Sequence, residues 1–164
     1  MQTVIRILFV CLGNICRSPL AEGIFRSRAT EMGLIEGADG EFIADSAGTG
    51  NWHAGSPPDR RSIAVAARHH IDIRALRARQ VRAEDFEEFD YVIAMDRDNL
   101  QALKALCPDH RHDRLHLLMS FAKGTPISEV TDPYYFRDES GFERVYAVID
   151  EGVEGLLAHL FPQR

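Results

Sequence analysis

Residues Val4–Cys11 form an almost unbroken apolar run that is rich in β-branched side chains (VIRILFVC). Such a run is typical of a strand in a parallel sheet that is buried on both faces. A short glycine-containing loop follows, and Ser18-Pro19 then predicts a helix start, with the serine as N-cap and the proline at the first helical position. An apolar stripe continues this helix to Met32-Gly33, through Leu20, Ile24 and Phe25.

The alternation of strands and helices continues along the chain. Further strands are expected at Phe42–Asp45, Tyr91–Met95 and Leu115–Leu118. Further helices are expected near Pro58–His70, opened by Ser56-Pro57, at Asp96–Cys107, and from Phe142 to Leu160. Alternating βα units predict an α/β fold, a three-layer αβα sandwich around a four-stranded parallel sheet. Ligands of such sheets bind beyond the C-terminal strand ends, which is where the loop Leu12–Arg17 lies.

Composition narrows the class of protein. A chain of 164 residues with 45% hydrophobic side chains fits a single domain, residues 1–164. Its 19 basic and 25 acidic side chains give a net charge of −6, which argues against sequence-independent nucleic-acid binding. No apolar run approaches the ~18 residues of a membrane span, and an odd count of three cysteines indicates free thiols in a reducing compartment. We expect a cytoplasmic protein that binds neither nucleic acid nor membrane.

The loop after the first strand separates Cys11 from Arg17 by five residues. Five residues can wrap the backbone into a ring whose N–H groups bind a tetrahedral oxyanion, and the next helix adds the positive end of its dipole. Arg17 offers a planar fork for two phosphate oxygens, and its charge favours a thiolate on Cys11. A thiolate at the bottom of this ring is a nucleophile for phosphorus. The alternative for Cys11 is an inert, small apolar side chain at a strand end.

Asp132 is the candidate general acid. When a thiolate attacks a phosphate ester, protonation of the leaving oxygen during P–O cleavage is expected to contribute roughly 10²–10⁴-fold. Pro133 stiffens the loop that carries this carboxylate. Once the thiol is phosphorylated, the same carboxylate can accept a proton from water. The alternative is a surface aspartate in an Asp-Pro turn.

The chain resembles the low-molecular-weight protein tyrosine phosphatases in four segments: Cys11–Glu22 (CLGNICRSPLAE), Asp45–Thr49 (DSAGT), Arg77–Gln80 (RARQ) and Asp132–Tyr135 (DPYY). The resemblance covers almost the whole chain. It implies the family's flavodoxin-like fold, the phosphotyrosine phosphatase I fold. It also implies hydrolysis of phosphotyrosine and aryl phosphate monoesters without a metal or cofactor, through a phosphocysteine intermediate. The implied partners are a tyrosine-phosphorylated protein and, as active-site ligands, inorganic phosphate or vanadate.

By position, the resemblance implies a role for each residue of the loop. Cys11 resembles the nucleophile, Arg17 the phosphate clamp and Asp132 the general acid. Asn14 resembles the residue that holds the loop's shape, and Ser18 the hydroxyl that stabilises the thiolate. The implied phosphate-binding loop comprises Leu12, Gly13, Asn14, Ile15, Cys16, Arg17 and Ser18.

The resemblance also implies a supporting histidine. His69 resembles the family histidine that hydrogen-bonds Asn14, with its neighbour His70 as the alternative. Leu76 is a departure, because many relatives have a histidine there. Seven arginines lie within Arg60–Arg82, and we interpret most of them as a solvated face.

Trp52, Tyr134 and Tyr135 are the candidate aromatic walls for a phenyl ring. A place in the core is the alternative for Trp52. Ile15 puts a branched apolar side chain at the rim, where related arginine phosphatases carry threonine, so an aryl substrate is favoured. Phe136-Arg137 stand where bacterial relatives commonly have glycines, which bears on the choice of protein substrate.

Cys16 is the candidate redox residue. Peroxide converts an accessible thiolate to a sulfenic acid, which a nearby thiol such as Cys16 can trap as a disulfide. The alternative is a small apolar side chain packed under the loop.

Three other functions compete with the phosphotyrosine phosphatase. A phosphoarginine phosphatase or an arsenate reductase would use the same fold, but the reductase needs further cysteines where only Cys107 remains. A zinc-binding module could use Cys11 and Cys16 with histidines such as His110, His112 or His116, but C-x₄-C without a second pair is a poor zinc signature. We expect no metal site, and a monomer or weak dimer.

Overall fold

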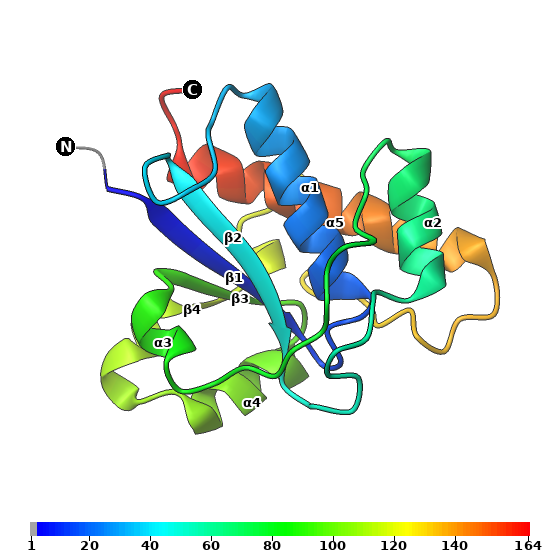
Figure 1. Ribbon diagram of the computed structural model, residues 1–164, viewed down its shortest axis with the longest axis horizontal. Helices are drawn as coiled ribbons and strands as arrows, with labels where there is room; N and C mark the ends of the chain where they lie inside the picture. The colour runs from blue at the N-terminus through cyan, green and yellow to red at the C-terminus, as the bar shows by residue number, and fades with distance from the viewer. Residues whose placement is uncertain (1–2) are drawn as a thin grey trace.

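The structure, a computed structural model, describes residues 3–164 and contains a four-stranded parallel sheet (Figure 1). Its strands are β1 (Ile5–Cys11), β2 (Phe42–Gly48), β3 (Tyr91–Ala94) and β4 (Leu115–Leu117), in the order β2-β1-β3-β4. The apolar run that opens the chain is therefore a central strand, paired on both sides. Its position explains why this run has no polar face.

Helices cover both faces of the sheet (Figure 1). One face carries α1 (Arg17–Glu31), α2 (Arg60–Arg68) and α5 (Glu139–Leu160), and the other carries α3 (Asp85–Glu88) and α4 (Arg97–Leu106). Two short 3₁₀ turns, η1 (Asp109–Arg114) and η2 (Leu118–Ser120), flank β4. Alternate residues of β1 enter the two cores: Phe9 packs with α1 and α5, whereas Val10 packs with α3 and α4. The predicted three-layer αβα sandwich is confirmed.

Element boundaries differ from the prediction at several places, and α5 begins at Glu139, three residues before the predicted Phe142. Ser18 is not an N-cap, because α1 already begins at Arg17 after Cys16. Ser56-Pro57 do not open α2, which begins at Arg60, since the side chain of Asp59 caps it by accepting the N–H of Arg61 at 2.8 Å. β2 continues to Gly48, because its last three residues keep their pairing with Phe9–Cys11 of β1. Within residues 3–164, no helix has the length and apolar character to cross a bilayer.

His70 lies just beyond α2 in the left-handed region, with a φ of +64°. This conformation costs an L-residue roughly 1–2 kcal/mol, and the His70 side chain is exposed. We expect His70→Gly to raise the free energy of unfolding by about 0.5–1 kcal/mol, since the greater freedom of glycine in the unfolded chain offsets part of the gain. Urea unfolding measures it, with His70→Ala as the matched control because it keeps the Cβ. An equal gain in both variants would contradict strain at this residue.

Candidate active site

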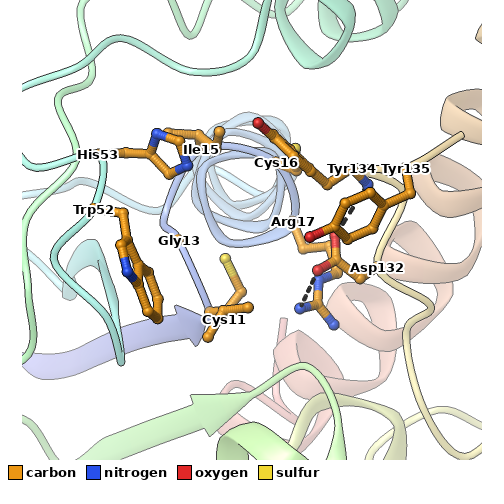
Figure 2. A pocket seen from close by; sticks show the side chains of 11 residues that line it. Cys11, Gly13, Ile15, Cys16, Arg17, Trp52, His53, Asp132, Tyr134 and Tyr135 are labelled. Carbon is orange, nitrogen blue, oxygen red and sulfur yellow. Dashed lines mark hydrogen bonds and ion pairs between the residues drawn. The ribbon is translucent and has the colours of Figure 1, made fainter.

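The loop between β1 and α1 forms the floor of a cavity of about 320 Å³ (Figure 2). The segment after β2 and the segment before α5 form its walls. The cavity brings together all residues predicted as catalytic and all those predicted as substrate walls, which are Cys11, Arg17, Asp132, Ile15, Trp52, Tyr134 and Tyr135. The location agrees with the rule that ligands of parallel sheets bind at the C-terminal ends of the strands.

The sulfur of Cys11 lies at the end of β1, and the residue is only 2% exposed. The backbone N–H of Asn14 donates to this sulfur at 3.3 Å, and the hydroxyl oxygen of Ser18 lies 3.1 Å from it. Asn14 has a φ of +57°, and this turn aims its N–H at the sulfur. Both groups can donate to a thiolate, which stabilises the nucleophilic form.

The guanidinium of Arg17 is held from behind. Its Nη1 donates to a carboxylate oxygen of Asp96 at 2.6 Å and to the carbonyl of Val130 at 2.9 Å, and its Nη2 lies 3.5 Å from Asp132 Oδ2. Burial alone would lower the pKa of Arg17, but the charge of Cys11 and the bond to Asp96 raise it. The buried Nε has no hydrogen-bond partner within residues 3–164. The positive charge of Arg17 and the N–H of its Nε are therefore available to bind an oxyanion.

Asp132 lies across the cavity from Trp52, with Cys11 between them (Figure 2). Its Oδ1 accepts the N–H of Tyr134 at 3.1 Å, which fixes the carboxylate at the start of its turn. The side chain is 32% exposed, so it can exchange protons with water while facing the cavity. This arrangement suits a group that must give a proton to a substrate oxygen and later take one from water.

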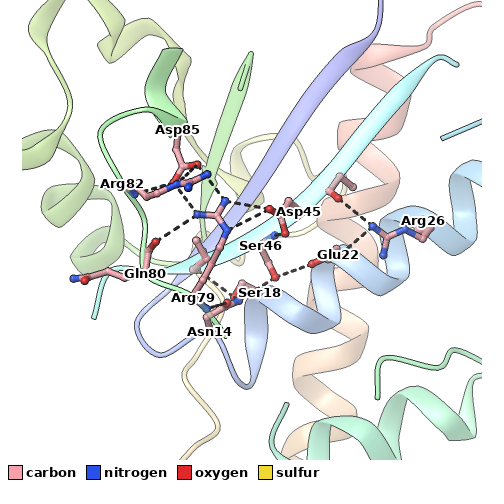
Figure 3. Close-up of polar contacts among 12 residues, drawn as sticks. Asn14, Ser18, Glu22, Arg26, Asp45, Ser46, Arg79, Gln80, Arg82 and Asp85 are labelled. Atoms are coloured by element: carbon pink, nitrogen blue, oxygen red, sulfur yellow. Dashed lines mark hydrogen bonds and ion pairs between the residues drawn. The ribbon is translucent and has the colours of Figure 1, made fainter. Parts of the chain in front are cut away.

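The side chain of Asn14 organises the polar contacts beneath the loop (Figure 3). Its Nδ2 donates to the hydroxyls of Ser18 at 2.8 Å and Ser46 at 3.0 Å, and its Oδ1 accepts the backbone N–H of Arg79 at 3.0 Å. Ser46 in turn donates to the carboxylate of Glu22 at 2.7 Å, and burial raises the pKa of Glu22. Ser18 thus serves the sulfur of Cys11 and the amide of Asn14 instead of capping α1.

His69 does not contact Asn14, so the prediction of that hydrogen bond is wrong. Its Nε2 lies 3.1 Å from a carboxylate oxygen of Glu143, and its ring stacks on Tyr146 with centroids 3.8 Å apart. Both partners belong to α5. The backbone of Arg79 occupies the place that the prediction gave to a histidine.

Sequence reasoning missed four residues that line the cavity or contact Arg17 or Asn14. Asp96 lies two residues after the end of β3, and a carboxylate near the C-terminal end of a strand is a signal that could have pointed to it. Ser46 lies inside the segment that carried the family resemblance, and His53 follows Trp52. Arg79 lies in the Arg77–Gln80 segment of the family resemblance and in the arginine-rich stretch interpreted mostly as a solvated face, and no local pattern predicts its contact with Asn14.

Aromatic side chains surround the mouth of the cavity. Trp52 is 70% exposed and Tyr135 is 84% exposed, so Trp52 belongs to the rim and not to the core. The ring of His53 lies 6.0 Å from that of Tyr134, centroid to centroid. Ile15 is buried against the loop and adds an aliphatic surface. The rim can therefore contact both faces of a flat ring.

Cys16 and Cys107 lie in different cores. Cys16 lines the cavity beside Cys11, and burial, followed by the nearby charge of Asp59, raises the pKa of its thiol. Cys107 packs with α3 and α4 on the opposite face of the sheet, and the described residues hold all three cysteines as free thiols. Among residues 3–164, no group of three or more His, Cys, Asp or Glu side chains could hold a metal ion.

Comparison with known proteins places the chain in a family. The model of the low molecular weight phosphotyrosine protein phosphatases matches residues 6–164. The chain belongs to this family. Among its relatives, the low molecular weight protein-tyrosine-phosphatase YfkJ of Bacillus subtilis is 41% identical over 157 residues, 96% of each chain.

Solved structures of other phosphatases share the fold. A protein tyrosine phosphatase from Entamoeba histolytica, crystallised with Hepes in its active site, has a TM-score of 0.88 and 36% identity over 95% of this chain and 96% of its own. An arginine phosphatase from Drosophila has a TM-score of 0.85 and 31% identity over 96% and 99%. Solved structures with this fold therefore include phosphatases named for two different phosphorylated side chains.

Proposed function

We propose that this phosphatase hydrolyses phosphotyrosine and other aryl phosphate monoesters through a phosphocysteine intermediate, without a metal or cofactor. One observation carries the proposal. The sulfur of Cys11 accepts the N–H of Asn14 and faces a cavity that Arg17 also lines, and the buried Nε of Arg17 has no hydrogen-bond partner among residues 3–164. A phosphoryl group is the ligand that satisfies both, because its oxygens accept hydrogen bonds and its phosphorus accepts the nucleophile.

In the first half-reaction, the Cys11 thiolate attacks phosphorus while Arg17 binds the equatorial oxygens. The P–O bond to the phenol breaks as Asp132 donates its proton to the leaving oxygen, so a neutral phenol departs. Asp96 and Val130 hold the guanidinium of Arg17 from behind, which keeps its charge in place without reorganisation during the reaction.

In the second half-reaction, water attacks the phosphorus of phosphocysteine. The Asp132 carboxylate takes a proton from that water, and the S–P bond breaks to return the thiolate and release phosphate. Ser18, 3.1 Å from the sulfur, stabilises the departing thiolate. One carboxylate therefore serves both half-reactions.

The aromatic side chains at the mouth of the cavity favour a substrate with an aromatic ring. Trp52 and Tyr134 present aromatic faces to a phenyl ring, and such contacts are worth about 0.5–1.5 kcal/mol each beyond the area they bury. We propose tyrosine-phosphorylated protein as the substrate, and phosphate or vanadate as competing ligands. We further propose one catalytic domain that acts in the cytoplasm as a monomer or weak dimer.

The direct test is hydrolysis of an aryl phosphate in the presence of EDTA. We expect full activity with EDTA and inhibition by vanadate. A dependence on added metal would contradict the mechanism.

Phosphoarginine is the second candidate substrate, favoured by the likeness to the Drosophila arginine phosphatase. Ile15 argues against it, because its apolar side chain lines the cavity where arginine phosphatases carry threonine. We expect Ile15→Thr to lower kcat/KM for phosphotyrosine peptide several-fold, about 1 kcal/mol of lost apolar contact, and to raise relative activity on phosphoarginine. Ile15→Val is the matched control. If wild type already prefers phosphoarginine, the aryl assignment is wrong.

An arsenate reductase would need a further thiol near Cys11 and Cys16, and the remaining cysteine, Cys107, is not there. Cys107 lies in the core between the sheet and α4, on the face opposite Cys16. A relay of oxidation through Cys107 would therefore have to cross the sheet.

We propose that Cys16 resolves oxidation of Cys11. Both cysteines line the cavity, so a sulfenic acid on Cys11 has a thiol neighbour. Peroxide should inactivate wild type, with nearly full recovery in dithiothreitol. Cys16→Ser should recover at most a few per cent, since over-oxidation is irreversible, while Cys107→Ser should behave as wild type. Equal recovery in Cys16→Ser would assign Cys16 to packing.

A further inference from the structure

The guanidinium of Arg79 is clamped between two carboxylates (Figure 3). It donates to both oxygens of Asp85, at 3.0 and 3.1 Å, and to Asp45 at 3.1 and 3.3 Å. Asp85 is fully buried at the start of α3 and also accepts the N–H of Arg82 at 2.8 Å, whereas the side chain of Asp45 is 45% exposed. Because a buried bidentate pair is shielded from water and salt, Asp85 is the stronger anchor.

The same clamp fixes the backbone around residue 79. The carbonyl of Arg79 accepts the N–H of Gly48 at 2.8 Å, and the carbonyl of Gly48 accepts the N–H of Val81 at 2.8 Å, so this segment extends the sheet beyond β2. Gly48 has no room for a side chain, since a Cβ there would lie 2.8 Å from the carbonyl oxygen of Leu12. The segment therefore lies directly behind the nucleophile loop.

The N–H of Arg79 dictates the orientation of the Asn14 amide. A backbone N–H can only donate, so the atom it meets at 3.0 Å must be Oδ1, and Nδ2 must face the two serine hydroxyls. Ser18 accepts from this Nδ2, so its own proton is left for one of two acceptors, the sulfur of Cys11 at 3.1 Å and the carbonyl of Ala47 at 3.5 Å. The carbonyl lies at the limit of a hydrogen bond, so the sulfur is the favoured acceptor. Each step of this chain points a donor toward the thiolate.

We propose that the Arg79–Asp85 ion pair is a positioning device for the nucleophile. It holds the Arg79 backbone against Asn14, and Asn14 directs the proton of Ser18 to the Cys11 thiolate. Arg79 does not touch the substrate; it acts through two hydrogen-bonded residues. The inference rests on the proposed function only in that the Cys11 thiolate is the nucleophile.

The test measures thiolate formation directly, by the pH dependence of iodoacetamide alkylation at Cys11, located by mass spectrometry. The principal variant combines Arg79→Met with Asp85→Asn, because Arg79→Met alone would leave a buried carboxylate with one guanidinium partner fewer. Arg79→Lys keeps the charge but not the fork. The matched control combines Arg28→Met with Asp150→Asn, which removes another bidentate pair, between α1 and α5.

We expect the pH midpoint of alkylation to rise by about 0.5–1 unit in the double variant, the range that loss of one well-aligned hydrogen bond produces. The value of kcat/KM below that midpoint should fall roughly 3–10-fold in parallel. Arg79→Lys should lie between the double variant and wild type. The Arg28/Asp150 control should lose thermal stability without any shift of the midpoint.

An unchanged midpoint in the folded double variant would overturn the proposal and leave the ion pair a purely structural role. If the double variant does not fold, the midpoint of Arg79→Lys is measured instead, and an unchanged midpoint in that variant would likewise overturn the proposal. Alkylation of Cys11 requires no turnover, so the test of this inference is independent of the test of the proposed phosphatase activity. A shifted midpoint in a protein that hydrolyses no phosphate ester would contradict the proposed function alone, and normal hydrolysis with no shift would contradict this inference alone.

Discussion

Cys11→Ser is expected to lower kcat on an aryl phosphate by 10⁴-fold or more, on the order of the losses seen when an enzyme's nucleophile is removed. A serine hydroxyl at this position has no general base within the contacts of Cys11, which are the N–H of Asn14 and the hydroxyl of Ser18. It would therefore remain protonated and unreactive. Steady-state kinetics and phosphate binding by calorimetry check the result, with binding retained.

Cys107→Ser is the matched control for this experiment, because it replaces a buried cysteine in the opposite core. Its activity should stay within a factor of two of wild type, as expected for a change away from the site. Arg17→Ala should be as inactive as Cys11→Ser and should also lose phosphate binding. Substantial turnover by Cys11→Ser would contradict a cysteine nucleophile.

Asp132→Ala is expected to lower kcat/KM, which reports the steps up to P–O cleavage, by roughly 10²–10⁴-fold on phenyl phosphate, the range for a lost general acid. The loss of kcat/KM should be much smaller on p-nitrophenyl phosphate, since p-nitrophenolate departs without a proton. The alkaline decline of kcat/KM should flatten at the same time, because no acid remains to be deprotonated. A set of phenyl phosphates with graded leaving groups measures all of this.

Asp132→Asn is the matched control. Its amide oxygen can still accept the N–H of Tyr134, but it has no acidic proton to give. We expect it to match Asp132→Ala in its dependence on the leaving group. Equal losses on good and poor leaving groups would show that Asp132 positions the substrate and does not protonate it.

The fold and the location of the site were predictable because their signals are local. The apolar run of β1, the apolar stripes of α1 and α5 and the C-x₅-R spacing each lie within a short stretch of chain. Cys11 and Arg17 are carried to one cavity by the loop that joins their elements. Asp132 is distant in sequence, and the Asp-Pro-Tyr-Tyr segment predicts its place in that cavity only through the family resemblance.

The contacts that support the loop were not predictable, because they depend on how distant segments pack. The resemblance predicts His69 beside Asn14, but the chain turns at the left-handed residue His70 just beyond α2, and the ring of His69 meets Glu143 of α5 instead. The side chain of Asn14 instead accepts a hydrogen bond from the backbone N–H of Arg79. Every residue except proline has a backbone N–H, so the sequence cannot indicate which one makes this contact. Ser18 is a residue type that commonly caps helices, but it lies inside α1, and its hydroxyl is hydrogen-bonded to the sulfur of Cys11.

The central claim is that phosphate passes through a covalent bond to Cys11, and rapid-quench mass spectrometry tests it most directly. Asp132→Ala should accumulate the intermediate with p-nitrophenyl phosphate, because the leaving group needs no acid while water lacks its base. Digestion of the quenched protein is predicted to show one phosphoryl group on the peptide that contains Cys11, and none in the Cys11→Ser, Asp132→Ala double variant. Continued turnover with no phosphoryl group on Cys11, or with one on another residue, would contradict the account.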